Sequence, residues 1–280
     1  MQFDPNTIYW QAHRGGGAHE APDNTLKAMH YGWSLGGIPE ADIRITQDDV
    51  IVCLHDDTLA RTTDAPEDIR DLPIQHVPFS RIQPLDAGRK FRPDCAGQRV
   101  PALAEVFDAM RQDPTRMLYC DIKNYDPQTF PRLFDGFKAL VDQHGLADQL
   151  IVAGCDYALN RRFKREIPAI HTLQWLGYWG PLNAAEQKLR QFDELARQNF
   201  ADLDLVQFHL LFNPKAAPHE WPFDIAVQDL QRALGLLGPR LQVFPWSFSE
   251  DALRQLVALG IRQFATDEPS RFAAIIRSLA

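Results

Sequence analysis

Short apolar runs alternate with longer amphipathic segments along most of the chain. The short runs have the length of β-strands, and the longer segments have the periodicity of helices. We expect strands at residues 8–12, 43–45, 50–54, 117–122, 149–153, 171–176, 203–208, 241–245 and 262–265. We expect helices at residues 24–35, 103–112, 127–143, 156–166, 184–198, 224–237, 250–259 and 269–279. Strands that alternate with helices form parallel sheets, and about eight such units favour a closed (β/α)8 TIM barrel.

Residues 56–100 interrupt this alternation, because they are rich in Pro, Asp and Arg and their apolar residues are scattered. We interpret this segment as a small insertion after the second strand region, placed at one end of the barrel. It is expected to cover part of the active site. A chain of 280 residues has the size of one such barrel, so we expect a single domain over residues 1–280.

Two helix starts have a local cause in the sequence. Asp126 followed by Pro127 combines a capping side chain with a residue whose ring fixes φ and which lacks an N–H. Ser249 is followed by Glu250 and Asp251, which suit the positive end of a helix dipole. Helices are therefore expected to begin at Pro127 and Glu250.

The composition is that of an ordinary globular protein, with 45% hydrophobic and 24% charged residues. The net charge of −8 argues against a nucleic acid or an anionic membrane surface as partner, since both require a basic face. No apolar run approaches the roughly 18 residues that a membrane helix needs, and no targeting segment is recognisable. We expect a cytoplasmic protein that acts on a small molecule, with its oligomeric state left open. The cysteines are widely spaced and are expected to be reduced and structural: Cys53, Cys95, Cys120 and Cys155.

Acidic residues lie at or beside two of the predicted strands. Glu40 and Asp42 are two residues apart, so on an extended chain they point to the same face. Asp121 ends another strand, and the strand ends of a barrel converge at one edge. Carboxylates held together need a cation between them, and carboxylates without cysteine suit a hard ion. The sequence therefore predicts one site for Mg²⁺ or Ca²⁺.

Two histidines and two cations accompany these acids. His13 and His55 each follow a predicted strand, where a pair of imidazoles could act as general acid and general base. Arg14 and Lys123 are suited to phosphate oxygens. The three acids and two cations leave a net charge of −1, which a divalent ion would reverse to +1. Such a site would attract a phosphodiester and stabilise the additional charge of its transition state.

Three motifs that contain these residues resemble those of the glycerophosphodiester phosphodiesterases. They are HRGGGAHEAPDNT at 13–25, EADIRITQDDVIVCLHD at 40–56 and LYCDIKN at 118–124. Further similar segments are LARTTD, LDAGRKF, VPALAEVFD, FPWSF and ATDEP, so the resemblance spans almost the whole chain and is weakest from about 157 to 240.

The resemblance implies a TIM barrel that hydrolyses glycerophosphodiesters, such as deacylated phospholipids, to sn-glycerol 3-phosphate and an alcohol. It implies that His13 and His55 are the acid and base, and that the reaction passes through a cyclic glycerol phosphate. The other roles that it implies are metal binding by Glu40, Asp42 and Asp121, phosphate binding by Arg14 and Lys123, and an aromatic wall at Trp246. Trp246 could equally be a lid over the barrel core.

The first motif departs from the family pattern in two ways. One additional residue separates His13 from Pro22, and Asp23 stands where the family has Glu. Because Asp is one methylene shorter, we expect its contact to be bridged by water. The loop residues His19 and Glu20 are expected to be solvated.

Other interpretations of the same residues stay open at this point. His13 and His55 could bind a transition metal in an amidohydrolase-like barrel, although Gly15 stands where such a site usually has a second histidine. The barrel could bind phosphodiester head groups without catalysis, or it could be a related phospholipase D-like lyase. His209 and Gln207 could line the pocket, but a hydrogen-bonding role in the core is the expected one.

Overall fold

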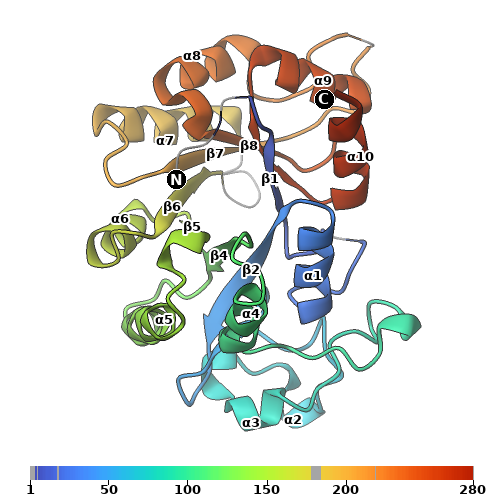
Figure 1. Ribbon diagram of the computed structural model, residues 1–280, viewed down its shortest axis with the longest axis vertical. Helices are drawn as coiled ribbons and strands as arrows, with labels where there is room; N and C mark the ends of the chain where they lie inside the picture. The colour runs from blue at the N-terminus through green and yellow to red at the C-terminus, as the bar shows by residue number, and fades with distance from the viewer. Residues whose placement is uncertain (1–3, 5, 18, 178–183, 218, 280) are drawn as a thin grey trace.

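Eight parallel strands close into a barrel in the computed structural model, which describes residues 4, 6–17, 19–177, 184–217 and 219–279 (Figure 1). The strands pair in the order β1-β9-β8-β7-β6-β5-β4-β2, and a pairing of β1 with β2 completes the circle. They are β1 (Tyr9–Ala12), β2 (Ile38–Ile45), β4 (Leu118–Ile122), β5 (Leu150–Gly154), β6 (His171–Leu176), β7 (Leu205–Leu210), β8 (Leu241–Pro245) and β9 (Gln263–Thr266).

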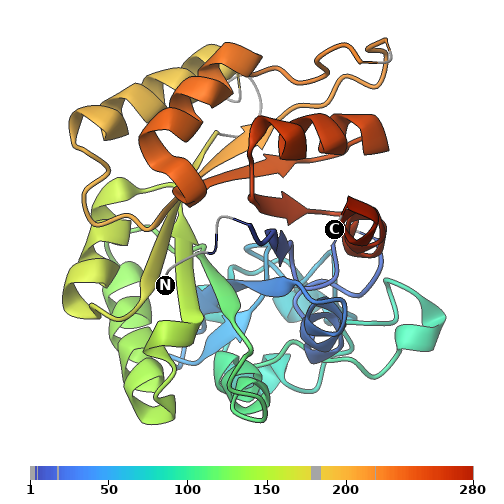
Figure 2. The same ribbon diagram turned by 45° about the horizontal axis from the view of Figure 1, so that its top comes forward.

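A helix follows each barrel strand and packs on the outside of the sheet (Figures 1 and 2). The helices are α1 (Leu26–Ser34), α4 (Leu103–Met110), α5 (Phe130–His144), α6 (Tyr157–Glu166), α7 (Ala185–Arg197), α8 (Val227–Leu237), α9 (Glu250–Leu259) and α10 (Pro269–Leu279). Short 3-10 turns, η3 (Ala147–Gln149) and η5 (Gly238–Arg240), precede β5 and β8. The prediction of a (β/α)8 barrel is confirmed.

The first and last strands of the chain, β1 and β9, are neighbours in the barrel. These two strands share four residue pairs, from Tyr9 opposite Gln263 to Ala12 opposite Thr266. On either side the pairing is shorter, with two pairs between β1 and β2 and two between β8 and β9. The first and last strands therefore form a unit that is joined to the rest of the barrel by short ladders.

Strand β2 is longer than its apolar residues indicate. It begins at Ile38, not at residue 43, so Glu40 and Asp42 lie inside the strand. Parallel pairing with β4 places Glu40 opposite Tyr119 and Asp42 opposite Asp121. The difference arises because buried acids and Pro39 interrupt the apolar run from which a strand is recognised. The adjoining strand β3 (Ile51–Cys53) pairs antiparallel with β2 and stands outside the barrel.

The insertion folds around an apolar cluster of its own. It contains two short helices, α2 (Glu67–Arg70) and α3 (Phe79–Ile82), and two 3-10 turns, η1 (Ile74–His76) and η2 (Pro93–Cys95). Its scattered apolar residues, among them Leu59, Ile74, Val77 and Ile82, pack together with Val52 of β3. In Figure 1 the insertion lies beside β2 and α4.

One of the two expected helix starts is correct. The Ser249 hydroxyl accepts a hydrogen bond from the Ala252 amide and caps α9, as predicted. The expected start at Pro127 is wrong, because α5 begins at Phe130. The Asp126 carboxylate instead accepts the amides of Gln128 and Thr129 and closes a turn that precedes the helix.

None of the four cysteines forms a disulfide, which agrees with the expectation that they are reduced. Three of them are buried, and Cys155 is half-buried. Among the residues that the structure describes, no helix is both long enough and apolar enough to cross a membrane.

Candidate active site

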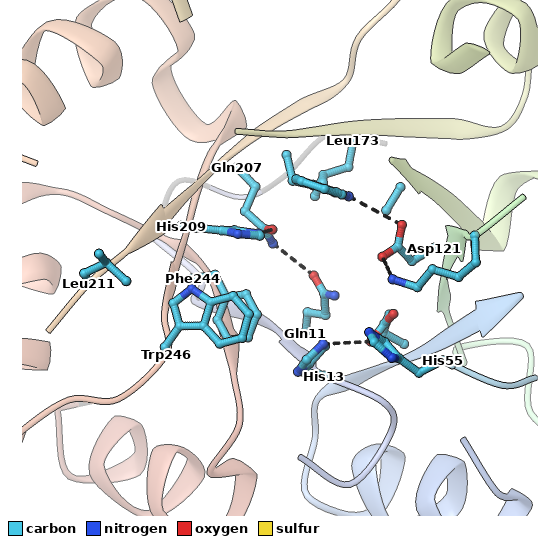
Figure 3. A pocket seen from close by; sticks show the side chains of 14 residues that line it. Gln11, His13, His55, Asp121, Leu173, Gln207, His209, Leu211, Phe244 and Trp246 are labelled. Carbon is cyan, nitrogen blue, oxygen red and sulfur yellow. Dashed lines mark hydrogen bonds and ion pairs between the residues drawn. The ribbon is translucent and has the colours of Figure 1, made fainter. Parts of the chain in front are cut away.

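A pocket of about 210 Å³ opens at the carboxyl ends of the barrel strands (Figure 3). One end is polar and is lined by His13, Glu40, His55, Asp121 and Lys123. The other end is mainly aromatic and apolar and is lined by Leu173, Trp175, His209, Leu211, Phe244 and Trp246. The location is the one at which TIM barrels carry their active sites.

The three predicted metal ligands lie together at the polar end. Glu40, Asp42 and Asp121 each offer a carboxylate oxygen, and these oxygens lie within 4.8 Å of one another. Oε2 of Glu40 accepts the backbone amide of Arg14 at 2.6 Å. Its other oxygen, Oε1, is buried and has no hydrogen-bond partner among the described residues. An unpaired buried carboxylate oxygen beside two further acids is suited to a hard cation.

Asp42 is held rigidly on both sides. Asn24 donates from Nδ2 to its Oδ2 at 2.7 Å and accepts the Asp42 amide through Oδ1 at 2.8 Å. The ammonium of Lys123 lies 2.9 Å from Oδ1 of Asp42 and 2.6 Å from Oδ2 of Asp121. Lys123 therefore contacts two of the three acids directly.

Burial and the surrounding charges shift the pKa values of Glu40 and Asp42 in opposite directions. Complete burial raises the pKa of Glu40 well above its usual value, and the nearby charges of Asp42 and Asp121 raise it further. Burial alone would raise the pKa of Asp42 as well, but Lys123, His55 and Arg14 outweigh it and hold that pKa well below the usual value. The raised pKa of Glu40 shows that a negative charge there is unfavourable without an added cation, which agrees with a site formed to hold positive charge.

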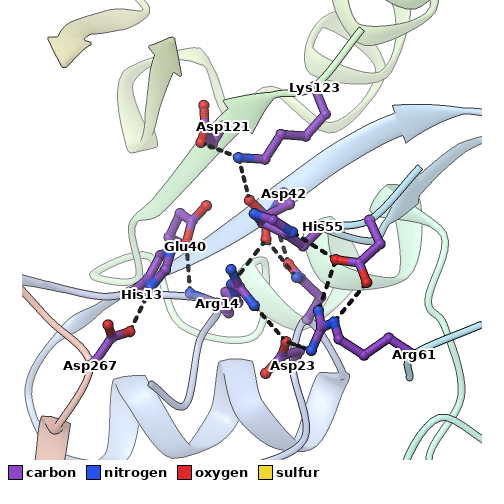
Figure 4. A network of polar contacts seen from close by, with 12 residues as sticks. His13, Arg14, Asp23, Glu40, Asp42, His55, Arg61, Asp121, Lys123 and Asp267 are labelled. Carbon is purple, nitrogen blue, oxygen red and sulfur yellow. Dashed lines mark hydrogen bonds and ion pairs between the residues drawn. The ribbon is translucent and has the colours of Figure 1, made fainter. Parts of the chain in front are cut away.

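Each predicted catalytic histidine is held by a carboxylate at Nδ1 (Figure 4). Nδ1 of His13 lies 2.6 Å from Asp267, and Nδ1 of His55 lies 2.8 Å from Asp56. An ionised carboxylate only accepts hydrogen bonds, so both Nδ1 atoms carry a proton. Nε2 of each ring is then the atom that can give or take a proton in the pocket. For His13 this atom lies 4.0 Å from Oε2 of Glu40.

Arg14 lies at the centre of a network that reaches the insertion (Figure 4). Its guanidinium donates to Asp23 at 2.9 Å and lies 4.0 Å from Asp42. Arg61, from the insertion, donates to the same Asp23 oxygen at 2.9 Å and binds Asp56 through Nε at 2.6 Å. The insertion therefore supports the partner of His55. Asp23 contacts both arginines directly, so the expected water bridge is not needed.

The aromatic end contains Trp246 and His209, which were considered from the sequence, and Trp175, which was not. Trp246 follows β8, and its ring stacks on Phe244 with centroids 4.9 Å apart. His209 lines the pocket and hydrogen-bonds Gln207 at 2.9 Å, so it combines the two roles considered for it. Trp175 donates from Nε1 to Asp121 at 3.4 Å.

The glycine-rich loop is fixed by contacts that were not expected. Oε2 of Glu20 accepts the Tyr31 hydroxyl at 2.6 Å and the Ser270 amide at 3.0 Å, so Glu20 ties this loop to α1 and α10. His19 is exposed, as expected. Asp267 and Asn24 were not assigned roles from the sequence, although they lie in the ATDEP and DNT segments that carried the resemblance.

The model of the glycerophosphoryl diester phosphodiesterase family matches residues 13–271. This range includes the three acids, both imidazoles and Asp267. A TIM barrel with this site is a phosphoric diester hydrolase. The chain belongs to the glycerophosphoryl diester phosphodiesterase family. The family match favours the phosphodiesterase interpretation over an amidohydrolase-like barrel.

Several relatives resemble the chain over nearly its whole length. A glycerophosphodiester phosphodiesterase from Caldanaerobacter subterraneus is 24% identical over 271 residues, which cover 95% of this chain and 96% of the relative. A solved structure from Silicibacter pomeroyi has a TM-score of 0.75 at 21% identity and covers 99% and 95% of the two chains. A phosphodiesterase from Oleispira antarctica, solved in complex with the product sn-glycerol-3-phosphate, has a TM-score of 0.74 at 20% identity, with 97% of each chain covered.

Proposed function

We propose that the protein hydrolyses glycerophosphodiesters to sn-glycerol 3-phosphate and an alcohol with the help of one divalent cation, Mg²⁺ or Ca²⁺. The observation that carries this proposal is the position of two carboxylate-held imidazoles beside three clustered acids. The related Oleispira enzyme, which binds sn-glycerol-3-phosphate as its product, supports the choice of substrate.

The cation would be held by Glu40, Asp42 and Asp121. When bound there, it would turn the negative site positive and stabilise the charge that develops on the phosphoryl oxygens. Lys123 and Arg14 both lie beside Asp42, so each can donate hydrogen bonds to a phosphate that is bound at the cation. Trp246 and Phe244 would form the wall against which the glycerol lies.

The reaction that fits two imidazoles and a substrate with a neighbouring hydroxyl proceeds in two steps. In the first, one imidazole takes the proton of the glycerol 2-hydroxyl as its oxygen attacks phosphorus. The bond from phosphorus to the alcohol breaks, and the other imidazole gives the alcohol oxygen a proton. In the second, water opens the cyclic phosphate while the two imidazoles exchange roles, and sn-glycerol 3-phosphate leaves.

The test is a screen of glycerophosphodiesters with metal-stripped protein to which Mg²⁺ or Ca²⁺ is added back. We expect no turnover after chelation and recovery with one of the two ions. Glu40→Gln should lower the affinity for the ion, measured by calorimetry, whereas Glu166→Gln removes an equivalent charge from the exposed α6 surface and should not. Full activity in excess chelator would exclude the metal-dependent mechanism.

The catalytic assignment has its own test. His13→Ala and His55→Ala should each lower kcat by about 10²–10⁴-fold, the usual contribution of a positioned acid or base. Undiminished hydrolysis by either variant would point to a barrel that only binds phosphodiesters, with a contaminating activity. An analogue that lacks the 2-hydroxyl should not turn over, and normal turnover of it would exclude the cyclic intermediate.

A further inference from the structure

His209 is held in one orientation at the aromatic end of the pocket, away from the acids (Figure 3). Its ring stacks on Trp175, with centroids 5.3 Å apart and an interplanar angle of 12°. Phe244 and Trp246 meet it edge-on, each at a centroid distance of 5.4 Å. A polar ring fixed among three aromatic rings needs an explanation beyond packing, because a phenylalanine would fill the same space.

The hydrogen-bonding direction of this ring can be traced from a backbone carbonyl. The Phe264 carbonyl only accepts, and Nε2 of Gln242 lies 3.3 Å from it, so this end of the Gln242 amide is the NH₂ group. Oε1 of Gln242 therefore accepts from Nε2 of Gln207. The remaining end of Gln207 is Oε1, and it lies 2.9 Å from Nε2 of His209. Since this oxygen only accepts, Nε2 of His209 must carry the proton.

The ring does not gain a second proton near neutral pH. Burial lowers the pKa of His209 to about 3, and the positive charges of Lys188, His13 and Lys123 act in the same direction. Lys188 is itself fixed close by, with its ammonium 2.6 Å from the His209 carbonyl oxygen. A neutral imidazole with its proton on Nε2 has a lone pair on Nδ1. Nδ1 accepts no hydrogen bond from the described residues and is the polar atom that His209 can offer to a ligand in the pocket.

We propose that Nδ1 of His209 accepts a hydrogen bond from the terminal hydroxyl of the substrate's glycerol, so that His209 selects the half of the diester that enters the aromatic end. This inference rests on the proposed function and adds the orientation of the substrate to it. The 2-hydroxyl, as the attacking group, belongs beside phosphorus and the two catalytic imidazoles. Phe244 lies between His209 and His13, with centroids 5.4 Å and 5.0 Å from them, so His209 is placed for a hydroxyl farther from phosphorus.

Because Nδ1 of His209 is a hydrogen-bond acceptor, it favours the half of the substrate that carries a hydroxyl at this end. An alcohol that ends in a quaternary ammonium group has no proton to donate and would leave Nδ1 without a partner, which disfavours it at this end. A hydroxyl satisfies the lone pair while its carbon chain lies against the rings of Trp246 and Phe244. The glycerol half therefore lies inside, and the alcohol that leaves lies toward the mouth of the pocket.

The test compares two diesters that share one leaving alcohol. One carries glycerol, and the other carries propane-1,2-diol, which keeps the attacking hydroxyl and lacks the terminal one. For the wild-type protein we expect kcat/KM to be about tenfold higher for the glycerol diester, the effect of one hydrogen bond. Equal kcat/KM for the two diesters would overturn the proposal.

Two conservative variants separate the acceptor from the packing. His209→Asn keeps an oxygen near the position of Nδ1 and should retain most of the preference for the glycerol diester. His209→Gln places its amide near the position of Nε2, where it can still bond Gln207, and should bring the ratio of the two kcat/KM values close to one. A ratio that falls equally in both variants, or in neither, would contradict the role of Nδ1, because both variants remove the ring that stacks on Trp175.

The same data distinguish this inference from the proposed function. If the wild-type protein hydrolyses neither diester, the proposed function fails. If it hydrolyses both without preference, the proposed function stands and the role of His209 is wrong. Thermal unfolding of each variant serves as the control for folding, since a general loss of stability changes both rates together and not their ratio.

Discussion

At the scale of single residues, the two imidazoles differ in what surrounds their carboxylates. Asp56 shares its charge with Arg61, which binds both of its oxygens at 2.6 and 3.0 Å. Asp267 binds His13 at 2.6 Å and has no ion pair with an arginine or lysine in the part of the chain that the structure describes. A carboxylate that is not neutralised holds an imidazole more strongly, so the hydrogen bond from Asp267 makes a large contribution to the orientation of His13.

We therefore expect Asp267→Ala to lower kcat by about tenfold to a hundredfold, part of the usual contribution of an acid or base. KM should change little, because Asp267 touches His13 and is not among the residues that line the pocket. Steady-state kinetics on one glycerophosphodiester measure both constants. The control is Glu268→Ala, which removes the adjacent charge and its pair with Arg271. This role would be contradicted if KM of Asp267→Ala rose by as large a factor as kcat fell. It would also be contradicted if kcat fell equally in Glu268→Ala.

Some of these residues could be predicted from the sequence, and others could not. Glu40, Asp42, His13 and His55 could be predicted because each lies beside an apolar run that reads as a strand, and a barrel brings its strands together. Asp267 lies 254 residues from His13, and its pairing depends on which strands close the barrel. Only the three-dimensional fold brings the two side chains into contact.

At the scale of elements, the loop between β1 and α1 is fitted closely against the chain that follows β9. Gly17 has φ +66, and a Cβ there would lie 2.2 Å from the Asp267 carbonyl oxygen and 2.6 Å from Pro269. The same stretch carries the carboxylate that orients His13. Packing of the glycine-rich loop and orientation of the imidazole are therefore linked.

Gly17→Ala should lower both stability and activity. A non-glycine residue at positive φ costs about 1–2 kcal/mol, and displacement of the Asp267 backbone adds to this loss. The matched control is Gly36→Ala, which has φ +86 but no atom within 4 Å of the added Cβ. Urea unfolding should show a similar loss of stability from backbone strain in both variants. Only Gly17→Ala should lose further stability, and its kcat/KM should fall at least tenfold. Equal behaviour of the two would show that the close contact is unimportant.

The limits of sequence-based prediction at this scale have physical causes. The alternation of apolar runs and helices predicted the barrel because both faces of its strands are buried. It missed the first half of β2, where function places buried acids in a strand. It also placed the start of α5 three residues early, since the Asp126 carboxylate that would cap a helix closes a separate turn. Local chemistry suggested a cap, and only the fold decides where the helix begins.

At the scale of the whole molecule, a second polar network holds the amino-terminal side of the barrel together. Asp204, just before β7, accepts the Thr172 amide of β6 at 2.9 Å and pairs with Lys164 of α6 at 3.0 Å. Burial alone would raise the pKa of Asp204, but hydrogen bonds from His171, Lys164 and Thr172 outweigh burial and lower it. A depressed pKa in the folded state stabilises the fold wherever the unfolded carboxyl would already be ionised.

Asp204→Asn should therefore destabilise the protein at pH 7 by about 1.5–3 kcal/mol, the range for a hydrogen bond to a charged group. The difference in the free energy of unfolding between the wild type and the variant should be complete above about pH 5. It should shrink as the pH falls below about 3.9, the pKa of the carboxyl in the unfolded chain, toward the lower pKa of Asp204 in the folded protein. Urea unfolding at pH 7 and pH 3 measures the difference. Asp193→Asn, which breaks an exposed pair with Arg232, serves as the control and should cost under about 1 kcal/mol at both pH values. If the stability lost in Asp204→Asn does not vary with pH, the charge of Asp204 is not the source of its contribution.

The pairing of the first strand with the last has a consequence for synthesis of the protein. A ribosome delivers His13 early and Asp267 only 254 residues later. The three acids of the proposed cation site are complete once Asp121 has emerged, so a nascent chain can gather them well before it can orient His13. Until β9 is made, β1 and β8 also present open strand edges, which are templates for aggregation. Production of active enzyme in a cell therefore depends on how well those edges are protected while the final strand is awaited.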